Sequence, residues 1–150
     1  MNYLGEPLAH RDVAWQVAYA KKKDVLDVMM NSNATLLNKK MAEDLLEAGL
    51  DNLFVSFDAI SLNLFADRRV GTTIGRVIDN VCNFVKLRNS RYPHVQIRIS
   101  MVMYKENKWL EQFEDFKVMW RDLDARCWLR DGRQRVLHRP SLSSPELPGT

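Results

Sequence analysis

Residues 95–103 read Val-Gln-Ile-Arg-Ile-Ser-Met-Val-Met, and this stretch decides the fold class. Most of its apolar residues fall on one face of a strand, whereas Gln96, Arg98 and Ser100 fall on the other. A central strand of an open, doubly wound sheet is apolar on both faces, because helices cover both. A polar second face instead indicates a strand that lines a ligand-bearing cavity, as in a barrel or a part of one.

The stretch 52–58 agrees with this interpretation, because it sets Ser56 and Asp58 on one face of a strand. Elsewhere, short apolar runs alternate with helical periodicity. The pattern predicts strands over 25–30, 52–57 and 95–103, and helices over 12–23, from Asn38 to Gly49, over 73–87 and around 109–120. Alternating strands and helices are typical of parallel βαβ units. We therefore expect an α/β fold with a curved sheet.

Composition narrows the class of protein. The chain has 150 residues, of which 46% are hydrophobic, enough for one domain with a real core. Its 22 basic and 19 acidic residues leave a net charge of +3, which argues against nucleic acid as a partner. No apolar run approaches the roughly 18 residues of a membrane span, and the N-terminus lacks a signal-peptide pattern, so no membrane partner is expected. Two cysteines suit a reducing cytoplasm.

The last thirty residues differ in kind, since they contain six arginines and no lysine. We expect residues 124–150 to be an irregular, Arg-rich C-terminal tail, separate from a domain over 1–123. It is either a solvated terminus or a basic segment that binds a partner. A third interpretation is a change of reading frame near Leu123, which the coding DNA would decide.

Three short segments offer groups for chemistry. Gly5-Glu6-Pro7 can present backbone carbonyls and a carboxylate to an ammonium group, although a plain turn before a helix has the same composition. Asn33-Ala34-Thr35 is an ordinary polar loop sequence. Ser56-Phe57-Asp58 ends a strand, where β/α folds bind ligands. Asp58 is either a ribose partner or a cap for the following segment.

The order of these segments resembles that of the radical S-adenosylmethionine (radical SAM) enzymes, over residues 3 to about 123. The motifs that carry the resemblance are, in chain order, Gly-Glu-Pro-Leu, Lys-Lys-Lys, Asn-Ala-Thr-Leu-Leu, Ala-Glu-Asp-Leu-Leu-Glu-Ala-Gly-Leu-Asp, Val-Ser-Phe-Asp-Ala, Arg69-Val70-Gly71, and Arg98 to Val102 leading to Glu106-Asn107. The later motifs are most similar to the branch that often carries a SPASM extension.

The resemblance implies a partial (β/α)6 TIM-like barrel. It also implies a 4Fe-4S cluster that reductively cleaves S-adenosylmethionine to a 5′-deoxyadenosyl radical, with a reductase partner for the complete enzyme. The implied cofactor-binding residues are Gly5, Glu6 and Pro7 at the methionyl amino group, Asn33 at the rim, Ser56 and Asp58 at the ribose or methionyl carboxylate, and Arg98 and Ser100 facing cofactor or substrate. The sequence does not specify that substrate.

One departure limits what the chain can do. The family holds its cluster with Cys-x-x-x-Cys-x-x-Cys, and this sequence has only Cys82, within an expected helix, and Cys127. Two distant cysteines do not ligate such a cluster. We therefore expect a truncated enzyme, with a barrel incomplete at both ends, that is inactive as the isolated chain. The alternatives are a non-catalytic binding or interaction module that keeps a nucleoside-shaped groove, and an unrelated α/β domain with a chance likeness.

Overall fold

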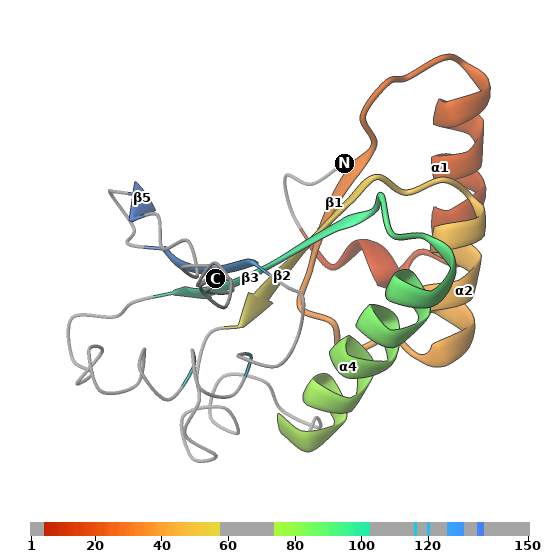
Figure 1. The fold of residues 1–150 in the computed structure, drawn as a ribbon. Helices are drawn as coiled ribbons and strands as arrows, with labels where there is room; N and C mark the ends of the chain where they lie inside the picture. The colour runs from red at the N-terminus through yellow and green to blue at the C-terminus, as the bar shows by residue number, and fades with distance from the viewer. Residues whose placement is uncertain are drawn as a thin grey trace, which may run out of the picture.

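The computed structural model describes residues 5–57, 74–102, 116, 120, 126–130 and 135–136, and its strands form one sheet (Figure 1). The strand order is β1-β2-β3-β4-β5. The strands are β1 (Met29–Ser32), β2 (Asn52–Phe57), β3 (Gln96–Val102), β4 (Arg126–Arg130) and β5 (Arg135–Val136). The first four pair in parallel and β5 pairs antiparallel with β4.

The helices pack on one side of this sheet (Figure 1). They are α1 (Val13–Lys22), α2 (Lys39–Glu47) and α4 (Ile74–Arg91), preceded by the short 3-10 helix η1 (Pro7–Ala9). An open doubly wound sheet would carry helices on both faces. The one-sided arrangement therefore agrees with part of a β/α barrel, as the polar face of residues 95–103 predicted.

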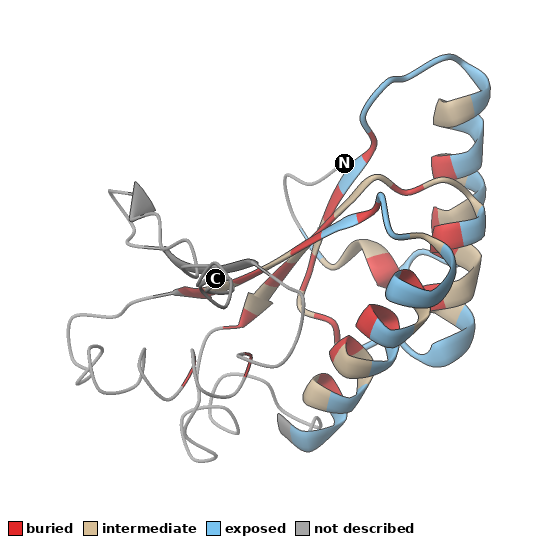
Figure 2. Cartoon of the chain, in the orientation of Figure 1, coloured by how far each residue is buried: buried red, intermediate tan, exposed pale blue. Residues whose placement is uncertain are grey.

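Burial alternates along the strands in the way that this arrangement requires (Figure 2). On β2 every second residue is fully buried, and the residues between them are half-buried. The helix-facing side of the sheet and the inner sides of the helices form one core, which includes Met30, Leu53, Val55, Phe57, Ile97, Ile99, Met101, Val13, Val17, Leu45, Leu46, Val77, Val81, Phe84 and Val85. The other side of the sheet is left for polar groups.

Local sequence explains both ends of α2. The Asn38 side chain accepts a hydrogen bond from the Met41 N–H at 2.9 Å, which caps the first turn. At the other end Gly49 has φ +91°, a left-handed conformation that glycine adopts without strain. The N–H groups of Gly49 and Leu50 donate to the carbonyls of Leu46 and Leu45, which is a Schellman ending. The helix predicted from Asn38 to Gly49 is thus confirmed at both ends.

Other boundaries differ from the prediction. The strand expected over 25–30 is β1, which starts only at Met29; in the residues before it, Asp24 has φ +60° and Leu26 lies 93% exposed. The irregular tail expected from residue 124 contains β4, which pairs with β3, and β5. A five-residue strand shows no clear periodicity, and its hydrogen bonds come from a neighbour that is distant in sequence. The boundary after residue 123 stays a prediction.

Of the helix predicted around 109–120, the structure describes only Phe116 and Trp120. Phe116 and Trp120 are both buried, and their rings contact Phe57 with centroids 6.0 and 5.8 Å away. These residues therefore belong to the core. Trp109 and Phe113 lie outside the described residues.

The amino ends of β1 and β2 are joined by the side chain of Asp51. Its carboxylate accepts hydrogen bonds from the Val28 N–H at 2.7 Å and from the Lys21 ammonium at 2.9 Å. Partial burial alone would raise the pKa of Asp51, but these two donors outweigh burial and hold the pKa below its ordinary value. Lys21 of the basic triplet is thus a structural partner of Asp51.

We expect Asp51→Asn to lower the free energy of unfolding at pH 7 by about 1–2 kcal/mol, since a charged acceptor of two hydrogen bonds is lost. The folded pKa is depressed, so this contribution is present above the unfolded pKa of about 3.9 and is lost as pH falls through the folded value. Urea unfolding at pH 7, 5 and 3 measures it. The exposed Asp44→Asn, which removes a surface pair with Lys40, is the control and should change little. If the difference in free energy of unfolding between wild type and Asp51→Asn stayed constant down to pH 3, it would contradict the lowered pKa of Asp51.

Within the described part of the chain, no helix combines the length and the apolar character needed to span a membrane.

Candidate functional site

The candidate site lies where the parallel strands end. The carboxyl ends of β1, β2 and β3 meet at one edge of the sheet, the edge at which β/α folds bind ligands. Register places Ser32 beside Val55, and Ser56 beside Ser100. Several of the residues implied by the resemblance therefore gather at this edge, while Asp58 lies outside the described residues.

Glu6 is fixed at this edge by hydrogen bonds to both of its carboxylate oxygens. The Ser32 hydroxyl donates to Oε1 at 2.7 Å and the Asn33 N–H donates to Oε2 at 2.8 Å. The Leu8 N–H also donates to Oε1, at 3.1 Å, which caps η1. These bonds tie the segment before η1 to the end of β1. The structure thus brings Glu6 and Asn33 together, as the resemblance implied.

Gly5, directly before Glu6, has open space beside its backbone. Gly5 has φ +94°, and a Cβ added there would meet nothing within 4 Å. Pro7 occupies the first position of η1, where its missing N–H is not needed. The backbone of Gly5 is therefore exposed beside the Glu6 carboxylate, and a ligand can approach it closely.

The loop after β1, residues 33–35, is held in an unusual conformation. Ala34 has φ +58° although it is not glycine, which costs about 1–2 kcal/mol, and its side chain is fully buried. The Ala34 N–H donates to the Ser32 Oγ at 2.9 Å. The Asn33 Oδ1 accepts from the N–H and the hydroxyl of Thr35, at 2.9 and 2.6 Å. The Asn33 side chain therefore supports its own loop.

The face of the sheet opposite the described helices carries further polar side chains, deeper along the strands. Ser56 and Ser100 are neighbours there, and the Ser100 hydroxyl donates to the Val55 carbonyl at 3.2 Å. Two residues earlier, about 7 Å deeper along the strands, the Arg98 guanidinium lies 5.0 Å from the centre of the Phe54 ring. This cation-π contact orients a positive charge on the face that carries the two serines.

This set of groups fits S-adenosylmethionine. The ligand carries an ammonium, a carboxylate and two ribose hydroxyls. The Glu6 carboxylate and the Gly5 backbone provide acceptors for the ammonium, and Arg98 provides a cation for the carboxylate. Serine hydroxyls at the strand ends can exchange hydrogen bonds with the ribose. The ammonium, the carboxylate and the ribose hydroxyls of the ligand each have a complementary group among these residues.

The described residues do not fit a 4Fe-4S cluster. Cys82 is the free cysteine among those with described side chains, and it is partly buried on α4. Burial raises the pKa of the Cys82 thiol, which disfavours the thiolate that binds iron. In the same part of the chain, no three His, Cys, Asp or Glu side chains are close enough to hold a metal ion.

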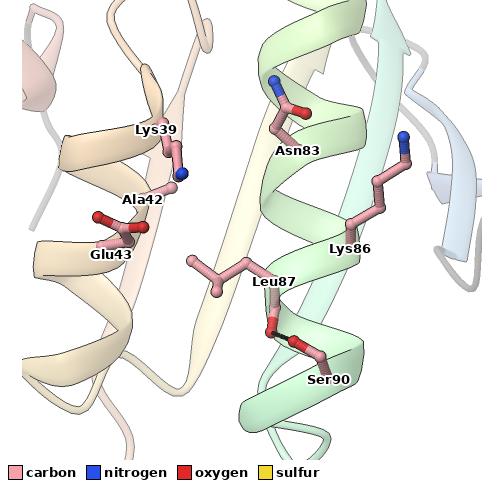
Figure 3. Close-up of a pocket in the computed structure, with 7 residues that line it drawn as sticks. All are labelled: Lys39, Ala42, Glu43, Asn83, Lys86, Leu87 and Ser90. Carbon is pink, nitrogen blue, oxygen red and sulfur yellow. Dashed lines mark hydrogen bonds between the residues drawn. The ribbon is translucent and has the colours of Figure 1, made fainter.

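A groove of about 350 Å3 lies elsewhere, between α2 and α4 (Figure 3). It is lined by Lys39, Ala42 and Glu43 of α2 and by Asn83, Lys86, Leu87 and Ser90 of α4. Two packed helices form this groove within the helix layer, and none of the residues at the carboxyl edge lines it. It is therefore not part of the candidate site.

Comparison with known proteins is decisive on the family. The chain matches the Radical SAM superfamily over residues 3–116, well over half of its length. The chain belongs to the radical SAM superfamily. The resemblance in the ordered motifs is thereby confirmed, and so is the partial barrel of the radical SAM type.

Curated proteins with similar sequences include two enzymes. It is 25% identical over 145 residues to an S-adenosylmethionine-dependent nucleotide dehydratase of Selenomonas ruminantium, which covers 95% of this chain and 52% of that protein. It is 37% identical over 78 residues to a GTP 3′,8-cyclase of Limosilactobacillus fermentum, which covers 51% of this chain and 23% of that protein. The chain thus spans about half the length of the first relative and less of the second.

Among solved structures, Streptococcus suis SuiB bound to S-adenosylmethionine superposes with a TM-score of 0.67. The match covers 87% of this chain and 28% of SuiB at 18% sequence identity. At this identity the likeness concerns the fold, which is the one that the sheet and its one-sided helices indicated.

Sequence reasoning missed two residues of the site. The strand predicted over 25–30 leaves out Ser32, which ends β1 in the structure and whose hydroxyl connects Glu6 with Ala34. Asn80 of α4 donates from Nδ2 to the carbonyls of Ala34 and Thr35. One signal existed for Asn80. It follows Val77 by three residues and precedes Phe84 by four, so a polar side chain stands in the apolar stripe and needs a partner.

Proposed function

We propose that this chain carries the S-adenosylmethionine-binding part of a radical SAM enzyme. The observation that supports this most directly is the Glu6 carboxylate, held by Ser32 and Asn33 at the carboxyl edge of the sheet beside the open backbone of Gly5. In this proposal Gly5 and Glu6 receive the methionyl ammonium. Pro7 sets the start of η1, and Asn33 lies at the rim of the site.

The remaining contacts belong to the polar face. Arg98 faces the methionyl carboxylate or the substrate, and Ser56 and Ser100 face the ribose. Asp58 keeps its proposed role at the ribose or the methionyl carboxylate, and the SPASM-type branch is likewise part of the proposal. In a complete enzyme, one electron from a 4Fe-4S cluster would cleave bound S-adenosylmethionine to methionine and a 5′-deoxyadenosyl radical, which would take a hydrogen atom from a substrate. Cluster ligands come from outside this chain, so the chain alone binds the cofactor without cleaving it.

The test is a calorimetric titration of the purified chain with S-adenosylmethionine. We expect a dissociation constant below about 1 mM, which corresponds to about 4 kcal/mol. Absence of binding at that concentration would refute the proposal. If 5′-methylthioadenosine, which lacks the amino-acid part, binds as tightly, the chain is instead a module that recognises only the nucleoside.

The cluster is tested separately by anaerobic reconstitution with iron and sulfide. We expect far fewer than the roughly four iron atoms of a 4Fe-4S cluster per chain, because the cysteine triad is missing. Roughly four iron atoms per chain, with broad sulfur-to-iron charge-transfer absorbance, would show that this expectation is wrong.

A further inference from the structure

Asn80 reaches the candidate site from α4, far away in the sequence. Its Nδ2 donates to the Ala34 carbonyl at 2.9 Å and to the Thr35 carbonyl at 3.4 Å. Asn80 precedes the fully buried Val81, on the side of α4 that packs toward the sheet. One amide group thus fastens the loop after β1 to the helix layer.

The loop needs this fastening. Ala34 has φ +58°, a conformation that a residue with a Cβ keeps only when its surroundings impose it. Two side chains impose it here. The Ser32 Oγ accepts from the Ala34 N–H, and Asn80 donates to the Ala34 carbonyl, so both polar groups of this residue are held.

The same loop positions Glu6. The Ser32 hydroxyl accepts from Ala34 and donates to the Glu6 Oε1, while the Asn33 N–H donates to the Glu6 Oε2. A turn of the Ala34 peptide would displace one or both donors. Contacts therefore run without a break from Asn80, through the loop, to the carboxylate.

We infer that Asn80 is a positioning residue for S-adenosylmethionine: by holding the Ala34 and Thr35 carbonyls, it orients the Glu6 carboxylate toward the methionyl ammonium. The inference rests on the proposed function and extends it to a helix residue that does not itself touch the ligand. It predicts that substituting Asn80 weakens only the binding of the amino-acid part of S-adenosylmethionine, because the nucleoside part contacts other groups.

The test compares Asn80→Asp and Asn80→Ala with Asn83→Asp, an exposed asparagine on the same helix. Asparagine and aspartate have nearly the same shape, but aspartate offers only acceptors to the two loop carbonyls. We expect about tenfold weaker binding of S-adenosylmethionine, which is about 1.4 kcal/mol, in the Asn80 variants and no change in Asn83→Asp. Affinity for 5′-methylthioadenosine should stay within about twofold of wild type, whereas general loosening of the fold would weaken both ligands.

A second measurement uses the wild-type chain, in case the variants do not fold. Hydrogen exchange at the Asn33 and Ala34 amides should slow when S-adenosylmethionine is added, because both amides donate to groups that the ligand orders. 5′-Methylthioadenosine should leave them unchanged. The inference would be overturned if Asn80→Asp lost equal affinity for both ligands, or if it bound S-adenosylmethionine as tightly as wild type. It would also be overturned if hydrogen exchange in the wild-type chain responded equally to both ligands. Failure of the wild-type chain to bind S-adenosylmethionine would instead refute the proposed function.

Discussion

Replacing Phe57 by alanine is expected to lower the free energy of unfolding by about 3–5 kcal/mol, the largest loss of stability among the substitutions considered for this chain. Phe57 ends β2, is fully buried, and packs its ring against Phe116 and Trp120. The centroids of the three aromatic rings lie 5.8–6.4 Å apart. None of these neighbours is a small side chain that could move into the space left by the Phe57 ring. Alanine would therefore create a cavity in addition to losing apolar burial.

Urea unfolding measures this loss, and Phe54→Ala in the same strand is the matched control. Phe54 is half-buried on the opposite face, where its ring contacts Arg98. Its removal deletes the same atoms but leaves a space that solvent can enter, so we expect a loss of about 1 kcal/mol. If the two variants lost similar amounts of free energy of unfolding, one face of β2 would not be the core face and the other the face of the candidate site.

The Glu6→Gln substitution is expected to weaken binding of S-adenosylmethionine by about 10- to 100-fold, the largest effect on the proposed function. Hydrogen bonds to a charged group contribute about 1.5–3 kcal/mol, and the substitution removes the charge that receives the ammonium. It also replaces one acceptor oxygen by an NH2 group. That group must face either the Ser32 hydroxyl or the Asn33 N–H, both of which donate in the native structure.

Calorimetric titration of Glu6→Gln measures the effect, with Glu47→Gln as the control. Glu47 is exposed at the end of α2, and its carboxylate lies 3.9 Å from Arg91, so its neutralisation should leave affinity unchanged. Combining Glu6→Gln with Asn80→Asp adds a second criterion. Because both act through the loop after β1, their effects on affinity should be less than additive. If Glu6→Gln bound S-adenosylmethionine as tightly as the wild-type chain, Glu6 would not be part of the binding site.

The two predictions concern residues whose places follow from one property of the strands. Along β2, Phe57 points into the core and Ser56 to the polar face, because successive side chains alternate. The helices that the structure describes lie on one side of the sheet, and β1, β2 and β3 each bury the side chains that face them while leaving the alternate side chains half-buried or exposed (Figure 2). The aromatic cluster stabilises the strand ends at which the candidate ligand-binding groups stand.

Much of the fold could be predicted because the signals are local. The polar and apolar faces of β3 follow from alternation along seven residues, and the bounds of α2 follow from Asn38 and Gly49. The order of the motifs similarly indicated the family and the Gly5-Glu6-Pro7 segment. For the strand and the helix, the residues that form the feature lie within a few positions of one another, whereas the family was indicated by short local motifs whose order extends along most of the chain.

Only the tertiary structure decided the rest. The start of β1 depends on Asp51, which binds the Val28 N–H from 23 residues away, and β4 depends on the ladder that β3 provides. The conformation of Ala34 and the orientation of Glu6 depend on Asn80, 46 residues after Ala34. A hydrogen bond between distant segments leaves no periodic trace in the sequence, because each partner alone is an ordinary polar residue. The sequence by itself indicated Glu6, Asn33 and Ser56 as groups at the carboxyl edge of the sheet, whereas the place of Ser32 and the packing of α4 against the loop after β1 became evident only in the tertiary structure.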